Sequence, residues 1–158
     1  MANITGVLGE FFNSLREVRG TQPLDLKLVK LLTELQPALS LDAQKVLLVY
    51  FSLLNDGNTC VSLNPRNLLA KWAFKWNGLK TQKKTLLAED ESENFLDAEE
   101  FAPIFEKGCA DLDALATVEE RMDGERRRKR FEILPLCVEY HGNEPFLFAD
   151  KYWKAKET

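Results

Sequence analysis

The fold class is predicted by one stretch near the C-terminal end, Leu136-Cys137-Val138-Glu139-Tyr140-His141-Gly142-Asn143-Glu144-Pro145-Phe146-Leu147-Phe148-Ala149. Apolar residues alternate along both halves of this stretch, as expected of two half-buried β-strands. Between the halves stands a cluster of turn-forming residues, His141–Pro145. The stretch therefore predicts a β-hairpin that forms most of a small sheet.

Upstream of the hairpin, the chain shows the period of helices. Apolar residues recur three and four positions apart from Ile4 to Val18 and again from Leu24 to Leu35. We expect Gly20–Pro23 to break the first helix. A third helix is expected after Ser40, whose side chain can cap it. The broad apolar face of this helix over residues 46–54 predicts that it lies at the centre of the domain.

A short strand and a fourth helix are expected next. A turn at residues 56–58 precedes Thr59–Leu63, which predicts a strand able to join the hairpin. Asn64 followed by Pro65 is typical of a helix cap and first turn, and we expect the helix to end at Asn77-Gly78. The apolar face of this helix is made by Leu68, Leu69, Trp72 and Trp76.

Residues 78–132 form a divergent, charged segment. Glu89–Glu100 holds seven acidic residues and no basic one, and Arg126–Arg130 is a run of five basic residues. Charge runs are typical of solvated loops, so we expect loops at both blocks and high mobility in the acidic one. The amphipathic stretch between the blocks, which predicts a helix, contains Phe101, Ile104, Phe105 and Cys109.

These patterns predict an α+β fold, in which a mainly helical domain of roughly five or six helices carries a small antiparallel sheet with the C-terminal β-hairpin. The 158 residues, with 45% hydrophobic residues, are enough for one domain over residues 1–158. Lys151–Glu157 has the sequence of a further helix opening at the end of the chain. We therefore expect the N-terminal accessory domain of a longer protein.

Composition narrows the protein class. Cys60, Cys109 and Cys137 are odd in number and form no Cys-x-x-Cys pair, so neither a disulfide framework nor a zinc site is indicated. A net charge of −4 gives no overall attraction to nucleic acid or to anionic membranes. The first residues, 1–5, lack the pattern of a signal peptide, and no apolar run approaches the ~20 residues that span a bilayer. We expect a cytoplasmic protein.

Catalytic motifs are missing from the sequence. None of the eight glycines is followed by Lys, as a phosphate-binding loop requires. The single histidine, His141, falls at a predicted turn, and Ser52 and Ser62 have no base at a motif spacing. The acidic residues crowd one predicted loop. We expect no enzymatic activity, no cofactor and no bound metal ion in this chain.

Two basic patches are candidates for nucleic-acid contact. In the first, lysines interleave with Trp72, Phe74 and Trp76, and such side chains could follow a phosphate backbone and stack on bases. The shared helical face of Trp72 and Trp76 instead favours a core position, with the lysines on the wet side. The second patch adjoins Asp123 and Glu125, which favours a solvated run. The candidates are Lys71, Lys75, Lys80, Lys83 and Lys84 in the first patch and Arg126, Arg127 and Arg128 in the second.

The order of several segments resembles the N-terminal domain of the RecD family, the alpha subunits of exodeoxyribonuclease V (the RecBCD helicase–nuclease). These segments are Pro23-Leu24-Asp25, residues 46–54, residues 56–63, the closing hairpin and Lys151–Glu157. The resemblance covers about the first 70 and the last 25 residues, whereas residues 78–132 match poorly. Pro145 also departs from the family, which usually has a polar residue there.

The resemblance implies that the whole protein is an ATP-driven, 5′-to-3′ DNA helicase in double-strand-break repair. ATP and Mg²⁺ would then belong to motor domains beyond this chain. The domain itself would dock onto a RecC-like subunit, beside a RecB-like one, and would meet DNA only through the whole complex and no membrane. Two alternatives stay open: a small nucleic-acid-binding module that uses the Lys71–Lys84 helix, and a regulatory protein that binds a partner through its acidic loop.

Overall fold

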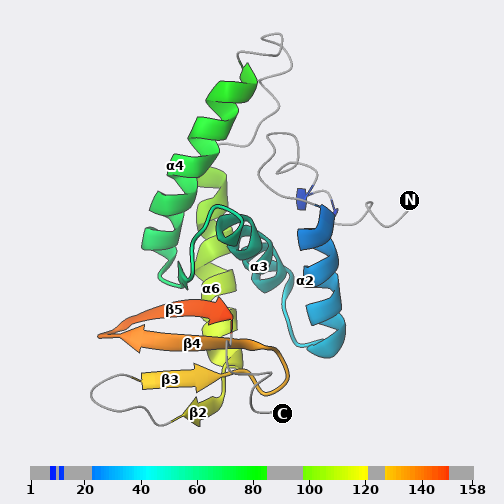
Figure 1. Ribbon diagram of the computed structural model, residues 1–158, viewed down its shortest axis with the longest axis vertical. Helices are drawn as coiled ribbons and strands as arrows, with labels where there is room; N and C mark the ends of the chain where they lie inside the picture. Colours follow the sequence, from blue (N-terminus) through cyan, green and yellow to red (C-terminus); the bar gives the residue numbers. More distant parts are fainter. Residues whose placement is uncertain (1–7, 10, 13–22, 85–97, 121–126, 150–158) are drawn as a thin grey trace.

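The computed structural model describes residues 8–9, 11–12, 23–84, 98–120 and 127–149 (Figure 1). Within the first predicted helix, Leu8, Gly9, Phe11 and Phe12 are helical, and both phenylalanines are buried. The rest of that helix, acidic residues 89–97, Arg126 and the expected helix opening at 151–157 lie outside the described residues.

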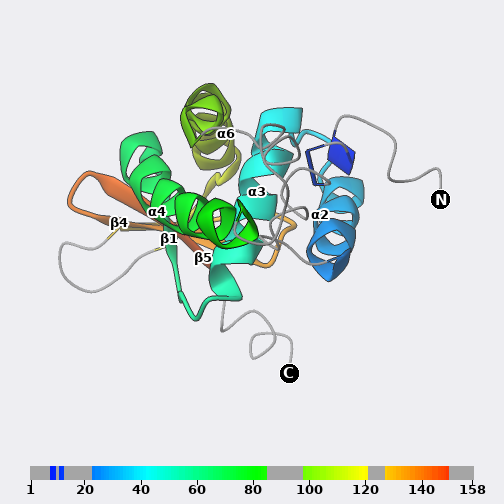
Figure 2. The same ribbon diagram turned by 90° about the horizontal axis from the view of Figure 1, so that it is seen from above.

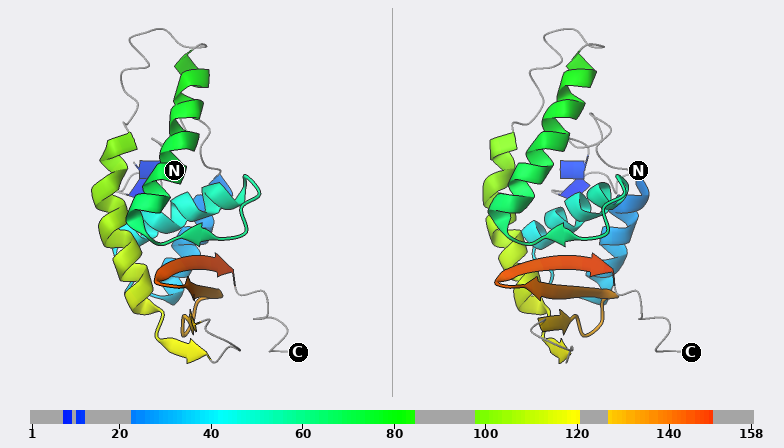
Figure 3. Two further views of the ribbon diagram at one scale, coloured as in Figure 1. Left: turned by 90° about the vertical axis from the view of Figure 1, so that its left-hand side faces the viewer. Right: turned by 60° about the vertical axis from the view of Figure 1, so that its left-hand side comes forward.

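In the described part of the chain, four α-helices and one 3-10 helix stand against a five-stranded antiparallel sheet (Figures 1 and 3). The strand order is β1-β5-β4-β3-β2. The α+β class with a C-terminal hairpin is thus confirmed. The helices are α2 (Pro23–Leu35), α3 (Leu41–Leu54), α4 (Pro65–Lys84), η2 (Ala98–Phe101) and α6 (Ala102–Leu115). The strands are β1 (Val61–Ser62), β2 (Val118–Glu120), β3 (Arg127–Arg130), β4 (Leu136–His141) and β5 (Glu144–Ala149).

Helix α3 is central, as its apolar face predicts. It lies between α2 and α6 (Figure 2), and Val46–Tyr50 are fully buried. The Ser40 hydroxyl accepts a hydrogen bond from the backbone N–H of Ala43 and donates one to Asp111 on α6. The expected cap therefore starts α3 and also ties it to α6.

The two helices α3 and α6 approach each other most closely at Gly108. A Cβ atom placed on Gly108 would lie 2.4 Å from Val46 Cγ2 and 2.5 Å from the backbone oxygen of Asp42. Real side chains do not make such contacts, and backbone cannot move aside as a flexible side chain does. A glycine in the middle of α6 costs helix stability, and here it allows the helix to touch its neighbour.

An aromatic cluster joins α4 to η2 and α6. The Asn64 side chain caps α4 by accepting hydrogen bonds from the backbone N–H groups of Arg66 and Asn67. Further along α4, Trp72 and Trp76 stack with their ring centroids 5.8 Å apart, and each makes an edge-to-face contact with Phe101. All three rings are fully buried. The prediction that both tryptophans lie in the core is confirmed.

The hairpin forms with a tighter turn than expected. His141 pairs with Glu144, which leaves only Gly142 and Asn143 in the turn, and Gly142 has a positive φ of 65°. Pro145 is the second residue of β5; it has no N–H to donate, but its carbonyl accepts from the backbone N–H of Leu63 at 2.8 Å. Strand β1 joins β5 as predicted, although it is shorter than the expected Thr59–Leu63.

Pro23 opens α2, one residue before the expected start at Leu24, because proline fits the first turn of a helix. The expected break at residues 20–22 lies outside the described residues. Two local expectations are wrong. Helix α4 does not end at Asn77-Gly78 but continues to Lys84, since one internal glycine costs only about 1 kcal/mol and good helix formers follow. Residues Arg127–Arg130 form strand β3, paired on both sides, instead of a solvated loop.

Replacement of Trp72 by Ala should lower the free energy of unfolding by about 3–5 kcal/mol, because it removes a large ring from a packed cluster. Phe74 lies on the same helix and is 87% exposed, so Phe74→Ala is the matched control and should change stability by less than about 0.5 kcal/mol. Urea unfolding of both variants measures the difference. Equal effects would contradict the core position of Trp72.

The buried thiol of Cys109 should make the domain sensitive to alkali. Burial raises its pKa to about 12, whereas an unfolded thiol has a pKa of about 8.5. Because the folded pKa is the higher one, the stability that this group contributes is fully present below pH ~8.5 and is lost as the pH rises towards 12. Urea unfolding at several pH values should show a steeper alkaline loss for the wild type than for Cys109→Ala; identical slopes would refute this.

Candidate functional site

The structure does not bring the two basic patches together. Lys71 and Lys75 lie on α4, which follows the edge strand β1, whereas Arg127 and Arg128 lie on β3, with β5 and β4 in between. The side chains of the remaining candidates are not described. Of Lys80, Lys83 and Lys84 the structure describes only the helical backbone, in α4, and Arg126 lies outside the described residues.

The Lys75 side chain binds to Ser52 and Asp56 of its own domain. Its ammonium donates to the Ser52 carbonyl at 3.0 Å and to the Ser52 hydroxyl at 3.1 Å, and it forms an ion pair with Asp56 at 2.8 Å. The same ammonium lies 5.7 Å from the centre of the Trp72 ring. Three donors therefore have three acceptors, and Lys75 has no donor left for a phosphate.

Lys75 completes the C-terminal end of α3. Backbone N–H groups after the helix bond to the carbonyls of Phe51, Leu53 and Leu54, and the Ser52 carbonyl goes to Lys75. The last turn of α3 contains no basic residue of its own. A helix C-terminus carries partial negative charge and unpaired carbonyls, so a cation from α4 satisfies both.

Lys129 completes the C-terminal end of α6 in the same way. Its ammonium donates to the Asp113 carbonyl at 2.8 Å and pairs with the Asp113 carboxylate at 3.0 Å. Asp113 lies in the last turn of α6, which again has no basic residue of its own. The hydroxyl of Tyr140 donates to the same carboxylate. Strands β3 and β4 are thereby fastened to the end of α6.

This cluster shifts the ionisation of its members. Burial raises the pKa of Tyr140, and the hydrogen bond to Asp113 raises it further. Burial alone would lower the pKa of Lys129, but its interactions with Tyr140 and Asp113 outweigh burial, and the pKa is raised. Lys129 therefore stays protonated and Tyr140 stays neutral around neutral pH, which is the state that the hydrogen bonds require.

The arginines of β3 are also engaged. Arg127 forms an ion pair with Glu119 on β2 at 3.1 Å, and its guanidinium lies 4.8 Å from the centre of the Tyr140 ring. Arg128 stands directly opposite Glu139 in the sheet, and both side chains are buried. The predicted solvated run is thus a strand in which Arg127 and Arg128 face carboxylates on neighbouring strands.

Lys71 and Phe74 are the exposed pair on α4. Phe74 is 87% exposed and Lys71 is also exposed. They stand three residues apart, so they lie on one side of the helix. An exposed cation beside an exposed ring is the combination that a stacking contact with single-stranded nucleic acid would use.

His141 and Ser52, the residues considered for a catalytic role, contact charged side chains of the domain. His141 Nε2 lies 3.2 Å from Glu139 at the end of the hairpin. Ser52 has a lysine neighbour that its sequence spacing could not reveal, because Lys75 is 23 positions away. The Lys75 ammonium donates to the Ser52 hydroxyl and forms an ion pair with Asp56. Within the described ranges, no group of three His, Cys, Asp or Glu side chains could hold a metal ion.

Replacement of Lys75 by Met keeps an unbranched apolar side chain but removes the ammonium and leaves the Ser52 carbonyl without its donor. We expect a loss of about 1–3 kcal/mol in the free energy of unfolding. Lys71→Met, on the same helix but exposed, should change it by less than about 0.5 kcal/mol. Urea unfolding measures both; unchanged stability in Lys75→Met would show that Lys75 does not cap α3.

None of the helices in the described part of the chain is both long and apolar enough to cross a membrane.

Comparisons with known proteins found no relative of this chain. No protein-family model matches the sequence, and no curated protein and no solved structure shows significant similarity to it.

Proposed function

We propose that this chain is the non-catalytic N-terminal domain of a RecD-like DNA helicase subunit of exodeoxyribonuclease V. In this proposal the domain docks the motor onto a RecC-like subunit in the cytoplasm, during double-strand-break repair. The observation that carries the proposal is the order of segments in the sequence, from Pro23-Leu24-Asp25 to the closing hairpin and Lys151–Glu157. Helicase activity, ATP and Mg²⁺ belong to the domains that would follow.

The electrostatics of the domain support docking over DNA binding. Binding to nucleic acid needs cations that are free to replace the counterions of phosphates. Lys75, Lys129 and Arg127 are instead held by carboxylates of the domain. The chain as a whole carries a net charge of −4. These three cations therefore serve the structure of the domain itself.

A stable contact with the partner subunit would bury on the order of 800 Å² on each side. Its centre should be apolar or aromatic, with a polar rim. Charged groups at the rim act mainly on the rate of association, so salt should slow the formation of the complex without abolishing it.

One observation favours the alternative of a nucleic-acid-binding module. Phe74 and Lys71 stand together, exposed, on one side of α4. Stacking of one base on an exposed ring contributes about 1–3 kcal/mol. One exposed ring and one exposed lysine would support only weak binding, which is why docking is the preferred function.

A pull-down of the RecC-like subunit from the same genome tests the proposal, with a parallel titration of single-stranded DNA. We expect the wild type and the double variant Lys71→Ala/Phe74→Ala to retain the subunit at moderate salt, and neither to bind DNA. Salt-sensitive DNA binding by the wild type, lost in the double variant and without retention of the subunit, would establish the alternative in place of docking.

A further inference from the structure

Helix α2 has apolar residues on two faces. Its inner face, with Leu26, Val29 and Leu32, is buried in the core. Its outer face carries three leucines that remain largely exposed: Leu24 at 61%, Leu31 at 52% and Leu35 at 45%. Leu28 is half-buried. Single exposed leucines are common on protein surfaces, but a line of them along one helix is a recognised mark of an interaction surface.

The spacing of these leucines is that of a coiled-coil seam. Positions 24, 28, 31 and 35 are separated by four, three and four residues, which is the alternation that keeps one stripe facing a partner helix. We call this set the α2 stripe. Helix α2 lies at the outside of the domain, with α3 on its inner side (Figures 1 and 2). A second helix therefore has access to the stripe.

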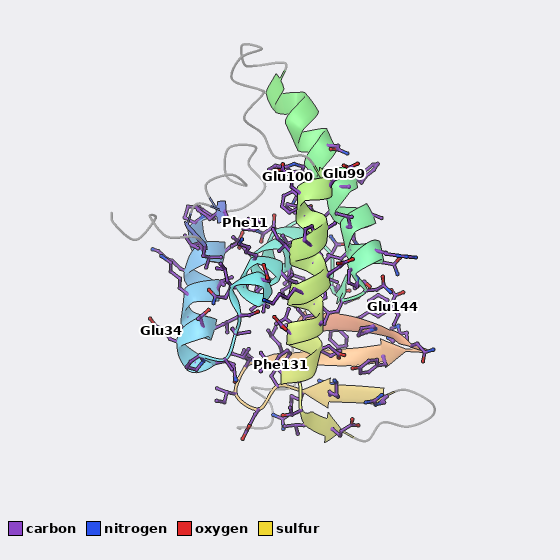
Figure 4. The ribbon with its side chains drawn as sticks, turned by 180° about the vertical axis from the view of Figure 1, so that it is seen from behind. Phe11, Glu34, Glu99, Glu100, Phe131 and Glu144 are labelled. Carbon is purple, nitrogen blue, oxygen red and sulfur yellow. The ribbon has the colours of Figure 1, made fainter. Side chains whose placement is uncertain are left out.

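Charges beside the stripe indicate which helix fits. Lys27 and Glu34 are exposed, stand seven residues apart on the same flank, and form no ion pair with any described residue. Glu34 points away from the domain at the outer side of α2 (Figure 4). The opposite flank, with Asp25 and Leu32, is buried. Only one flank is open to a partner.

An antiparallel copy of α2 satisfies this arrangement. When Leu24 faces Leu35 of the second copy, Leu28 faces Leu31. On the open flank, Lys27 then meets Glu34 of the second copy, and twofold symmetry repeats the pair. A parallel copy offers these two charges no opposite partner. The stripe and its flank are thus complementary to themselves in one orientation.

We infer that the α2 stripe binds a second copy of this chain in an antiparallel helix pair with twofold symmetry. Helix α2 has 13 residues and is ~20 Å long. Such a contact buries less than the ~800 Å² per partner of a standard interface, so the dimer is weak, with a Kd on the order of 10⁻⁴ M. This inference does not depend on the proposed function.

Sedimentation equilibrium of the whole chain at concentrations up to about 1 mM tests the inference, because this range brackets the expected Kd. The wild type should form dimers, and Leu31→Asp should be monomeric throughout. Phe74→Asp places the same charge at an exposed apolar position on α4 and should dimerise like the wild type. Circular dichroism and urea unfolding confirm that each variant is folded.

Charge reversal tests the orientation. Lys27→Glu and Glu34→Lys should each weaken the dimer about tenfold, because each places two like-charged pairs across the contact. The double variant Lys27→Glu/Glu34→Lys should regain the wild-type Kd, since both pairs are again opposite in sign. A heterologous partner helix could not produce this recovery.

Several results would overturn the inference. A wild type that stays monomeric over the whole range excludes the dimer. Dimerisation that survives Leu31→Asp places the contact elsewhere, and a double variant as weak as the single ones excludes the antiparallel pair. Retention of a RecC-like subunit through the stripe, without self-association, would assign the surface to that partner instead.

Discussion

The close contact of α3 and α6 at Gly108 is the constraint on which the rest of the structure depends. The two helices are in direct contact at the Asp42 backbone and the Val46 side chain, with no room for a Cβ atom. The two ends of α6 contact different parts of the domain. Phe101, just before its N-terminus, meets the tryptophans of α4, and Asp113 at its C-terminal end holds the sheet. A displacement of α6 at Gly108 would disturb both.

The sequence predicts the elements whose signals are local. Ser40 and Asn64 mark the starts of α3 and α4, and the alternation over residues 136–149 marks the hairpin, because caps and turns depend on neighbouring residues. Strands β2 and β3 could not be predicted in this way. The acceptors that make a strand of Arg127–Arg130 favourable, Glu119 and Asp113, come from other elements. Hydrophobic periodicity carries no signal for such a strand.

The candidate site was predicted only in part, for the same reason. Residue type and helical spacing correctly placed Trp72 and Trp76 in the core and Lys71 in solvent. They could not show that Lys75 reaches the end of α3, since the Ser52 carbonyl is defined by the tertiary structure. At the start of α4, Glu144 of the hairpin (Figure 4) accepts a hydrogen bond from the side-chain amide of Asn67 at 2.6 Å. Charged residues from distant segments thus complete two helix ends and place a carboxylate beside the start of a third helix.

The strand order has a consequence for aggregation. An open sheet can recruit further strands along its edges, and long, flat, apolar edges are the hazard. Among the described strands, the edges are β1, with two residues, and β2, with the three residues Val118–Glu120. Both edges are short, and β2 carries the exposed carboxylate of Glu119, so neither offers a long apolar template. The longest strands, β4 and β5, lie in the interior, so concentrated solutions of the folded domain should resist amyloid-like growth.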